Sequence, residues 1–267
     1  MSESDDYLSK STNDEDVNSI NSFLDNLNGV TRDDKLTIEG ILKSKVMTNS
    51  YDSRIGFQEE IKALSGQANK SANPNFQFLR QYLRAVEHLP LNNNTPGPIS
   101  ANKIFVMEHI NEYFDNLAIK MMTMIVGCEC KIFDCVEGAN DGGYFGYMND
   151  YFSKEPLTGA VIQGVSACNS LSGMIVFHQA EYLFEIPGIM NLIDRNNRKK
   201  FIDRYLAFPL DLSKFTILFF VDNFNCIPSN LQEHFHKMDY NFIQTIKIKK
   251  KSSSKNSIQD NESVHRS

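Results

Sequence analysis

Two short apolar runs constrain the fold of this chain more than any other feature. They are MIVF at 174–177 and TILFFV at 216–221, and both are rich in β-branched and aromatic residues. Between them, the segment IMNLIDRNNRKKFIDRYL at 189–206 is typical of a helix. Apolar runs of this kind, separated by a helix, indicate a βαβ unit whose parallel strands are buried on both faces. The sequence therefore predicts an α/β fold.

Helical periodicity fills the chain before this unit. Apolar residues recur at helical spacing over 17–89, most clearly over 76–89, and that last helix is expected to stop at Pro90. The next ten residues, LNNNTPGPIS, are turn formers and predict a boundary. Beyond them, the apolar positions of 101–126 suit the face of one further helix.

The composition and the spacing of apolar residues change after this predicted helix. The segment CKIFDCVEGAND at 130–141 predicts a short strand and a turn, and DGGYFGYMNDYF at 141–152 predicts a loop rich in glycine and aromatic residues. The stretch VIQGVSACN at 161–169 predicts another helix.

The two ends differ from the centre in composition. The first 20 residues carry six acidic side chains against one lysine, whereas 249–267 is basic and then rich in serine. Neither end can bury enough apolar area to offset its chain entropy, so we expect disordered tails at 1–19 and 249–267. The chain has 27 Lys and Arg against 33 Asp and Glu, a net charge of −6, and we expect no specific nucleic-acid partner.

Cysteine usage and hydropathy favour a reducing compartment. The five cysteines are odd in number and irregularly spaced, as reduced intracellular thiols are. The spacing C-x-C-x₄-C of Cys128, Cys130 and Cys135 is not a recognised zinc pattern, so we expect no metal. The sequence has no signal peptide and no run of 18 uncharged apolar residues. We expect an intracellular protein, with the cytoplasm favoured, and no membrane contact.

An ordered series of short motifs begins within the predicted βαβ unit. The series consists of Leu-Ile-Asp at 192–194, Phe-x-Asp-x-Tyr-Leu at 201–206, Pro-x-Asp-Leu-Ser-Lys at 209–214, a strand that runs to Asn223, and Ile227-Pro228. In this order it resembles the ATPase module of the Lon proteases, which belong to the AAA+ class. Weaker upstream matches extend the resemblance over roughly 55–245.

This resemblance implies a domain organisation. It places a AAA+-like parallel sheet with flanking helices at 101–248, and a helical segment that resembles the helices before the Lon ATPase module at 20–91. The chain offers no segment for the lid subdomain or for a protease domain with its Ser-Lys pair. We therefore expect no peptidase activity.

The phosphate-binding loop of the family is missing. An ATP site of this class needs backbone amides around the phosphates, a lysine and a Mg²⁺-binding hydroxyl, which a G-x-x-x-x-G-K-[ST] loop supplies, and the sequence contains no such loop. If 101–126 is a helix, the first strand and the loop are absent between 126 and 131. An alternative register makes 103–106 the first strand and places the glycine-free stretch 109–116 at the loop. Neither way of matching the sequence to the family leaves a loop that could bind the phosphates.

Other positions that act on nucleotide in the family are also changed. The resemblance places His178 and Gln179 at the Asp-Glu pair that holds Mg²⁺ and activates water. Neutral imidazole is a poor ligand for Mg²⁺, and an amide is no base. Asn223 retains the sensor asparagine, and His234 stands where a neighbouring subunit's arginine is expected. We expect no catalytic residues and no cofactor, with these four as vestigial pocket positions.

An aromatic cluster follows the predicted glycine turn. Its members are Tyr144, Phe145, Tyr147, Tyr151 and Phe152. Two interpretations stay open: an exposed loop that binds a partner, or side chains that fill the core.

Together these features predict a pseudoenzyme. The leading hypothesis is a catalytically inactive Lon-like AAA+ module that serves as a structural or protein-interaction subunit, with a large assembly or an active AAA+ ring as its partner. The alternative is a Lon-family AAA+ protein that binds and hydrolyses ATP for protein unfolding or degradation.

Overall fold

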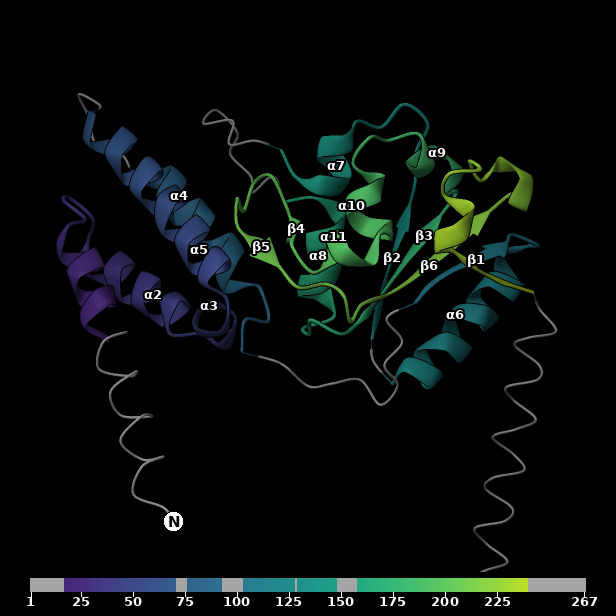
Figure 1. Cartoon of the computed structure of the whole chain (residues 1–267), viewed down its shortest axis with the longest axis horizontal. Coiled ribbons are helices and arrows are strands. Elements are labelled where there is room, and N and C mark those ends of the chain that lie inside the picture. Colours follow the sequence, from purple (N-terminus) through teal and green to yellow (C-terminus); the bar gives the residue numbers. More distant parts are fainter. Residues whose placement is uncertain (1–16, 71–75, 93–102, 128, 148–157, 240–267) are drawn as a thin grey trace, which may run out of the picture.

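A five-stranded parallel sheet forms the centre of the computed structural model, which describes residues 17–70, 76–92, 103–127, 129–147 and 158–239 (Figure 1). The strands are β1 Ile104–Glu108, β2 Cys130–Asp134, β3 Met174–His178, β6 Thr216–Val221 and β7 His236–Met238. They lie in the order β2-β3-β6-β1-β7, and every neighbouring pair is parallel. The two apolar runs are the adjacent strands β3 and β6. The predicted α/β fold is confirmed.

Side chains of the central strands alternate between two apolar layers. Val176, Leu218 and Phe220 belong to a cluster with Ala118 and Met122 of α6 Glu112–Val126. The residues of β3 and β6 that alternate with these point to the other face of the sheet. They belong to a larger core that includes α8 Ala160–Ala167. Successive strand residues point to opposite faces, so a strand covered on both sides must be apolar throughout. This is why β6 is buried at all six of its positions.

Short elements complete the α/β part. They are α7 Asp141–Phe145, α9 Glu181–Phe184, α10 Ile189–Ile193, α11 Arg195–Arg198, the antiparallel pair β4 Phe201–Ile202 and β5 Pro209–Leu210, and the 3-10 helices η1 Phe224–Cys226 and η2 Gln232–His234.

Helices precede the sheet, as the periodicity predicts. Residues 17–25 are helical, and α2 Arg32–Leu42, α3 Lys45–Asn49, α4 Tyr51–Lys70 and α5 Gln77–Glu87 follow. The expected disorder is therefore wrong for residues 17–19, and the rest of both predicted tails lies outside the described residues. In the part of the chain that the structure describes, no helix is long and apolar enough to cross a membrane.

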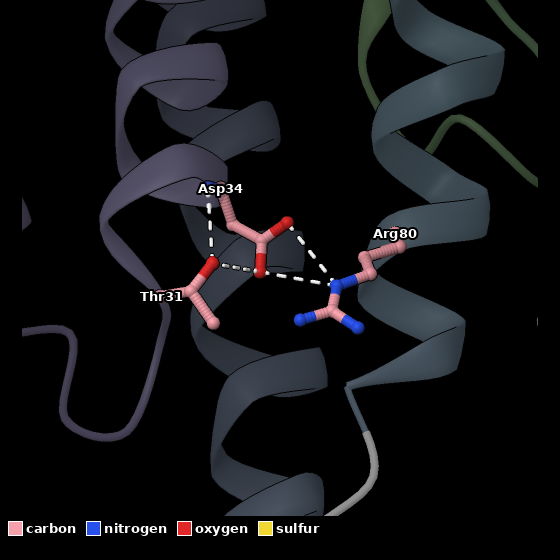
Figure 2. A network of polar contacts seen from close by, with 3 residues as sticks. All are labelled: Thr31, Asp34 and Arg80. Carbon is pink, nitrogen blue, oxygen red and sulfur yellow. Dashed lines mark hydrogen bonds and ion pairs between the residues drawn. The ribbon is translucent and has the colours of Figure 1, made fainter.

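A polar network joins α2 to α5 (Figure 2). Thr31 caps α2, because its hydroxyl oxygen accepts a hydrogen bond from the backbone N–H of Asp34 at 3.2 Å. The same hydroxyl donates to the Asp34 carboxylate at 2.7 Å, and Nε of Arg80 reaches that carboxylate from α5 at 3.2 Å. A helix cap and a surface ion pair thus share one carboxylate.

The helical segment packs directly on the α/β part. The hydroxyl of Tyr82 donates to the carbonyl oxygen of Leu206 at 2.7 Å in the buried interior. Phe57 of α4 meets Phe208 edge to face, with ring centroids 6.1 Å apart. Ser53 donates to the carbonyl oxygen of Pro209 at 2.6 Å. One continuous core therefore spans both parts.

The single helix predicted over 101–126 is wrong. Residues 104–108 form β1, which pairs with β6 on one side and with β7 on the other. Asn111 then starts α6, because its side chain accepts a hydrogen bond from the N–H of Phe114 at 3.1 Å. The apolar residues of 104–108 fit both periods, and pairing within the sheet decides between them. The alternative register, with a first strand near 103–106, matches this arrangement.

Two further segments differ from their predictions. The expected helix over 189–206 is broken, since Asp194 is extended and caps a new helix through Asn196 and Asn197. Beyond α11 the chain forms β4 and a turn. The loop predicted over 141–152 begins with α7, which the side chain of Asn140 caps at Gly143. Local capping side chains account for both differences.

Candidate functional site

The carboxyl edge of the sheet is the candidate site. From β1 the chain crosses to β2 at one edge of the sheet, returns through β3 and β6, and then crosses to β7 on the far side of β1. Open parallel sheets bind ligands outside the carboxyl ends of the strands, at such a reversal of strand order. Glu108, His178 and Val221 end β1, β3 and β6 at this edge.

Two histidines share one buried carboxylate at this edge. Asp115, in the first turn of α6, is only 2% exposed. Nδ1 of His109, which directly follows β1, lies 2.6 Å from Oδ2 of Asp115, and Nδ1 of His178 lies 3.5 Å from the same oxygen. The ring of His178 also stacks on Phe220 at 4.7 Å. We call these three residues the His-Asp-His cluster.

Nδ1 of both rings faces the Asp115 carboxylate. A carboxylate that accepts from Nδ1–H leaves Nε2 of His109 as the acceptor of that ring. The His109 side chain is 47% exposed. Nucleophilic catalysis also needs a hydroxyl or a thiol bonded to the base. Within the described residues, neither histidine ring has a hydrogen bond to a Ser, Thr or Cys side chain.

The connection from β1 to α6 is too short to wrap a phosphate. Only residues 109–111 lie between the last residue of β1 and the first of α6, and none is glycine. A G-x-x-x-x-G-K-[ST] loop has four residues between its glycines alone. In addition, the side chain of Asn111 occupies the N–H of Phe114, an amide that a bound anion would use.

Negative side chains surround the same helix end. Glu108 precedes the connection, Glu112 begins α6, and the Asp115 carboxylate is buried in its first turn. Glu108 accepts a hydrogen bond from the N–H of Phe224 at 2.9 Å, which ties β1 to η1. Acidic residues in the first turn complement the helix dipole that would otherwise attract a phosphate. Three carboxylates therefore lie at or beside the N-terminal end of α6.

Of the four vestigial positions, only His178 enters the cluster. Gln179 follows it with a φ of 54°, in the left-handed region that glycine favours, so its backbone is strained. Asn223 caps η1, where its side chain accepts from the N–H of Asn225 at 2.9 Å. His234 lies in η2, with Nε2 3.8 Å from the carboxylate of Glu233. Asn223 therefore has a local structural use.

The aromatic cluster divides between core and surface. Tyr144 and Phe145 of α7 are 6% and 2% exposed, and their rings pack against Phe177 and Phe201. Tyr147 is 39% exposed and donates to the side-chain oxygen of Asn140 at 2.8 Å. Tyr151 and Phe152 lie outside the described residues. Core filling therefore holds for Tyr144 and Phe145, and a partner-binding loop with these two side chains exposed is wrong.

Two of the cysteines that the structure describes, Cys135 and Cys168, are buried free thiols. Burial raises the pKa of Cys135 to about 11, and it raises that of Cys168 to about 11 as well. A thiol that stays protonated is neither a strong nucleophile nor a metal ligand. Among the described residues, no three His, Cys, Asp or Glu side chains are arranged to hold a metal ion. Cys128 falls outside those residues.

The sequence missed three acidic groups and one histidine at the edge. They are Glu108, His109, Asp115 and Glu181. Glu181 follows β3 by three residues, and one of its carboxylate oxygens is buried without a hydrogen-bond partner in the described structure. For Glu108, His109 and Asp115 the usable signal was the largely polar stretch 108–115, where β1 ends and the capped helix α6 begins.

Neither models of protein families nor a search of curated proteins gives a match to this chain. A functional proposal therefore rests on the sequence motifs and on the geometry of the carboxyl edge.

Proposed function

We propose that this chain is a catalytically inactive, Lon-like AAA+ module that works without nucleotide as a structural or protein-interaction subunit of a larger assembly. The observation that supports the proposal is the carboxyl edge beside β1, where a three-residue connection without glycine, a capped helix end and a buried carboxylate follow the strand.

Electrostatics supports the loss of nucleotide binding. Two unit charges of the same sign 4 Å apart repel each other by about 4 kcal/mol at an effective dielectric constant of 20. A triphosphate at this edge would face the carboxylates of Asp115, Glu108 and Glu112. No lysine lies in the connection or in the first turn of α6 to offset them.

Retention of the packing motifs supports a structural role. In the Phe-x-Asp-x-Tyr-Leu motif, Asp203 binds three backbone N–H groups, and Tyr205 lies in the core against Tyr82. The motif thus joins the helical segment to the α/β part. A chain that keeps these contacts keeps its shape, whether or not the edge performs chemistry.

Exposed apolar side chains beside the cluster support an interaction role. Ile110 and Tyr113, in the connection and the first turn of α6, are 53% and 70% exposed. Tyrosine is enriched among the residues that dominate binding energy at protein interfaces. These two side chains give a protein partner an apolar contact at the same edge that excludes nucleotide.

The deciding experiment is titration of the full chain with a fluorescent ATP analogue, with and without Mg²⁺. We expect no saturable Mg²⁺-dependent binding. Binding that requires Mg²⁺ and weakens in an Asn223→Ala variant would overturn the proposal in favour of the ATP-hydrolysing alternative.

The interaction role is tested by quantitative affinity enrichment from the source cells. Tyr113→Ser should reduce recovery of a co-purifying protein, whereas Met124→Ser should not, because Met124 is 58% exposed at the opposite end of the same helix. Equal recovery with both variants would show that this edge is not the contact.

A further inference from the structure

A pocket lies between the helical segment and the α/β part, away from the carboxyl edge. Its volume is about 300 Å³, and its walls come from the α3–α4 junction on one side and from 199–214 on the other. Ser53 bridges the two walls through its hydrogen bond to the carbonyl oxygen of Pro209. Leu171, just before β3, forms part of the lining, which places the pocket toward the amino edge of the sheet.

The lining is basic, although the chain as a whole has a net charge of −6. Four lysines and two aspartates line the pocket: Lys45, Lys199, Lys200, Lys214, Asp52 and Asp211. The pocket therefore carries a local excess of two positive charges in an acidic protein.

Three of these four lysines have no acidic partner in the part of the chain that the structure describes. Nζ of Lys200 lies 2.7 Å from the Asp52 carboxylate, and this hydrogen bond raises the pKa of Lys200. The amines of Lys45, Lys199 and Lys214 have no carboxylate within ion-pair distance among the described residues. Asp211 is engaged locally, since its carboxylate accepts from the N–H of Ser213 at 2.9 Å.

We propose that this pocket binds a small phosphate-bearing anion with at least two negative charges. Lysine ammonium groups bind phosphate as point charges, and three lysines with no ion pair among the described residues line this one concave site. The volume suits a small molecule and is far too small for a folded partner. The inference is independent of the proposed function, since it concerns different residues and the opposite edge of the sheet.

Binding would fasten the two parts of the molecule together. Lys45 belongs to the helical segment, whereas Lys199 and Lys214 belong to the α/β part. A ligand that contacts both walls binds only the folded state, so it stabilises the protein by mass action. The expected effect is a rise in unfolding temperature that grows with ligand concentration.

Isothermal titration of the full chain with inorganic pyrophosphate tests the inference. The double substitution Lys199→Gln and Lys214→Gln should weaken binding by about tenfold or more, because it removes two of the unpaired amines. The matched control is Lys120→Gln with Lys131→Gln, which removes the same charge from exposed positions on α6 and β2. The control should change the affinity by less than about threefold.

A third variant predicts a change in the opposite direction. Asp52→Asn frees Lys200 and removes a negative charge from the lining, so pyrophosphate should bind several-fold more tightly. Both lysine positions and Asp52 are exposed, and a thermal unfolding curve of each variant verifies that it folds.

The outcomes separate this inference from the proposed function. Equal affinities in the two double variants, or no binding at all, would contradict the proposed anion site in the pocket. Either result would leave the proposal for the carboxyl edge unchanged. Binding that survives Lys199→Gln with Lys214→Gln but is lost in His178→Ala would place phosphate at the carboxyl edge and overturn both.

Discussion

Two buried aspartates of this chain have opposite surroundings. Asp203, at the junction with the helical segment, is 1% exposed, and its carboxylate accepts from the N–H groups of Gly159, Tyr205 and Leu206. Asp115, at the carboxyl edge, is 2% exposed and faces two histidine rings. In the described structure no backbone N–H reaches the Asp115 carboxylate.

The difference separates a structural carboxylate from an adjustable one. Backbone amides cannot move away from Asp203 without unfolding the turn at 203–206, so this carboxylate fixes the backbone. The partners of Asp115 are side chains, which can change rotamer without a change in the backbone. This contrast yields four predictions of decreasing size.

The largest effect is expected for Asp203→Asn. The amide replaces one carboxylate oxygen by an NH₂ group, which leaves at least one buried backbone N–H facing another donor. We expect a loss of about 3 kcal/mol in the free energy of unfolding, measured by urea denaturation. Asp222→Asn, at an exposed position after β6, is the control and should stay within about 0.5 kcal/mol of the parent. Equal losses of unfolding free energy in the two variants would show that Asp203 has no special structural role.

The second prediction concerns pH. Burial raises the pKa of Asp203 to about 6, and the three backbone hydrogen bonds oppose this shift without cancelling it. In the unfolded chain an aspartate has a pKa of about 3.9, so the folded protein binds more protons between these two values. The contribution of Asp203 to stability is therefore complete below about pH 4 and is lost as pH rises to about 6, by about 2 to 3 kcal/mol.

Urea denaturation of the parent and of Asp203→Asn across this pH range measures the effect. The difference in unfolding free energy between the two proteins should shrink as pH rises, because the asparagine does not titrate. Parallel pH profiles would show that Asp203 is ionised at the same pH in both states.

The third prediction applies the same substitution at the carboxyl edge. Asp115→Asn keeps an oxygen that can accept from His109 and leaves no backbone N–H unsatisfied, so we expect a loss of only about 1 kcal/mol. The measurement is the same urea titration at neutral pH. A loss as large as that of Asp203→Asn would mean that the edge is as rigid as the junction, and the contrast between the two carboxylates would fail.

Sequence patterns could predict the parts of the fold that depend on local composition. β3 and β6 are apolar at nearly every position, which only a doubly covered strand requires, and the helices before the sheet show clear periodicity. β1 was expected only in the alternative register, because the five residues 104–108 are compatible with either period. The helix over 189–206 was overextended because the capping side chain of Asp194 breaks it.

The candidate site was less predictable, since it depends on the order of the strands. His109 and Asp115 lie more than 60 residues before His178 in the chain, and only the adjacency of β6 to both β1 and β3 brings them together. Nothing in a single sequence fixes that order. The resemblance to Lon gave His178 as a vestigial pocket position, whereas it placed His109 and Asp115 only within the stretch 109–116 that replaces the phosphate loop.

The smallest effect is expected on the surface, where the network of Figure 2 joins α2 to α5. Arg80→Gln removes the ion pair with Asp34, but Thr31 still holds that carboxylate, and the Arg80 side chain is 48% exposed. We expect the free energy of unfolding to fall by about 0.5 kcal/mol at low salt. The difference should disappear in 1 M NaCl, because salt screens exposed charges. Arg84→Gln is the matched control, because Arg84 is exposed on the same helix and has no ion pair among the described residues. A loss near 2 kcal/mol that persists in high salt would show that this contact, like Asp203, holds the backbone in place.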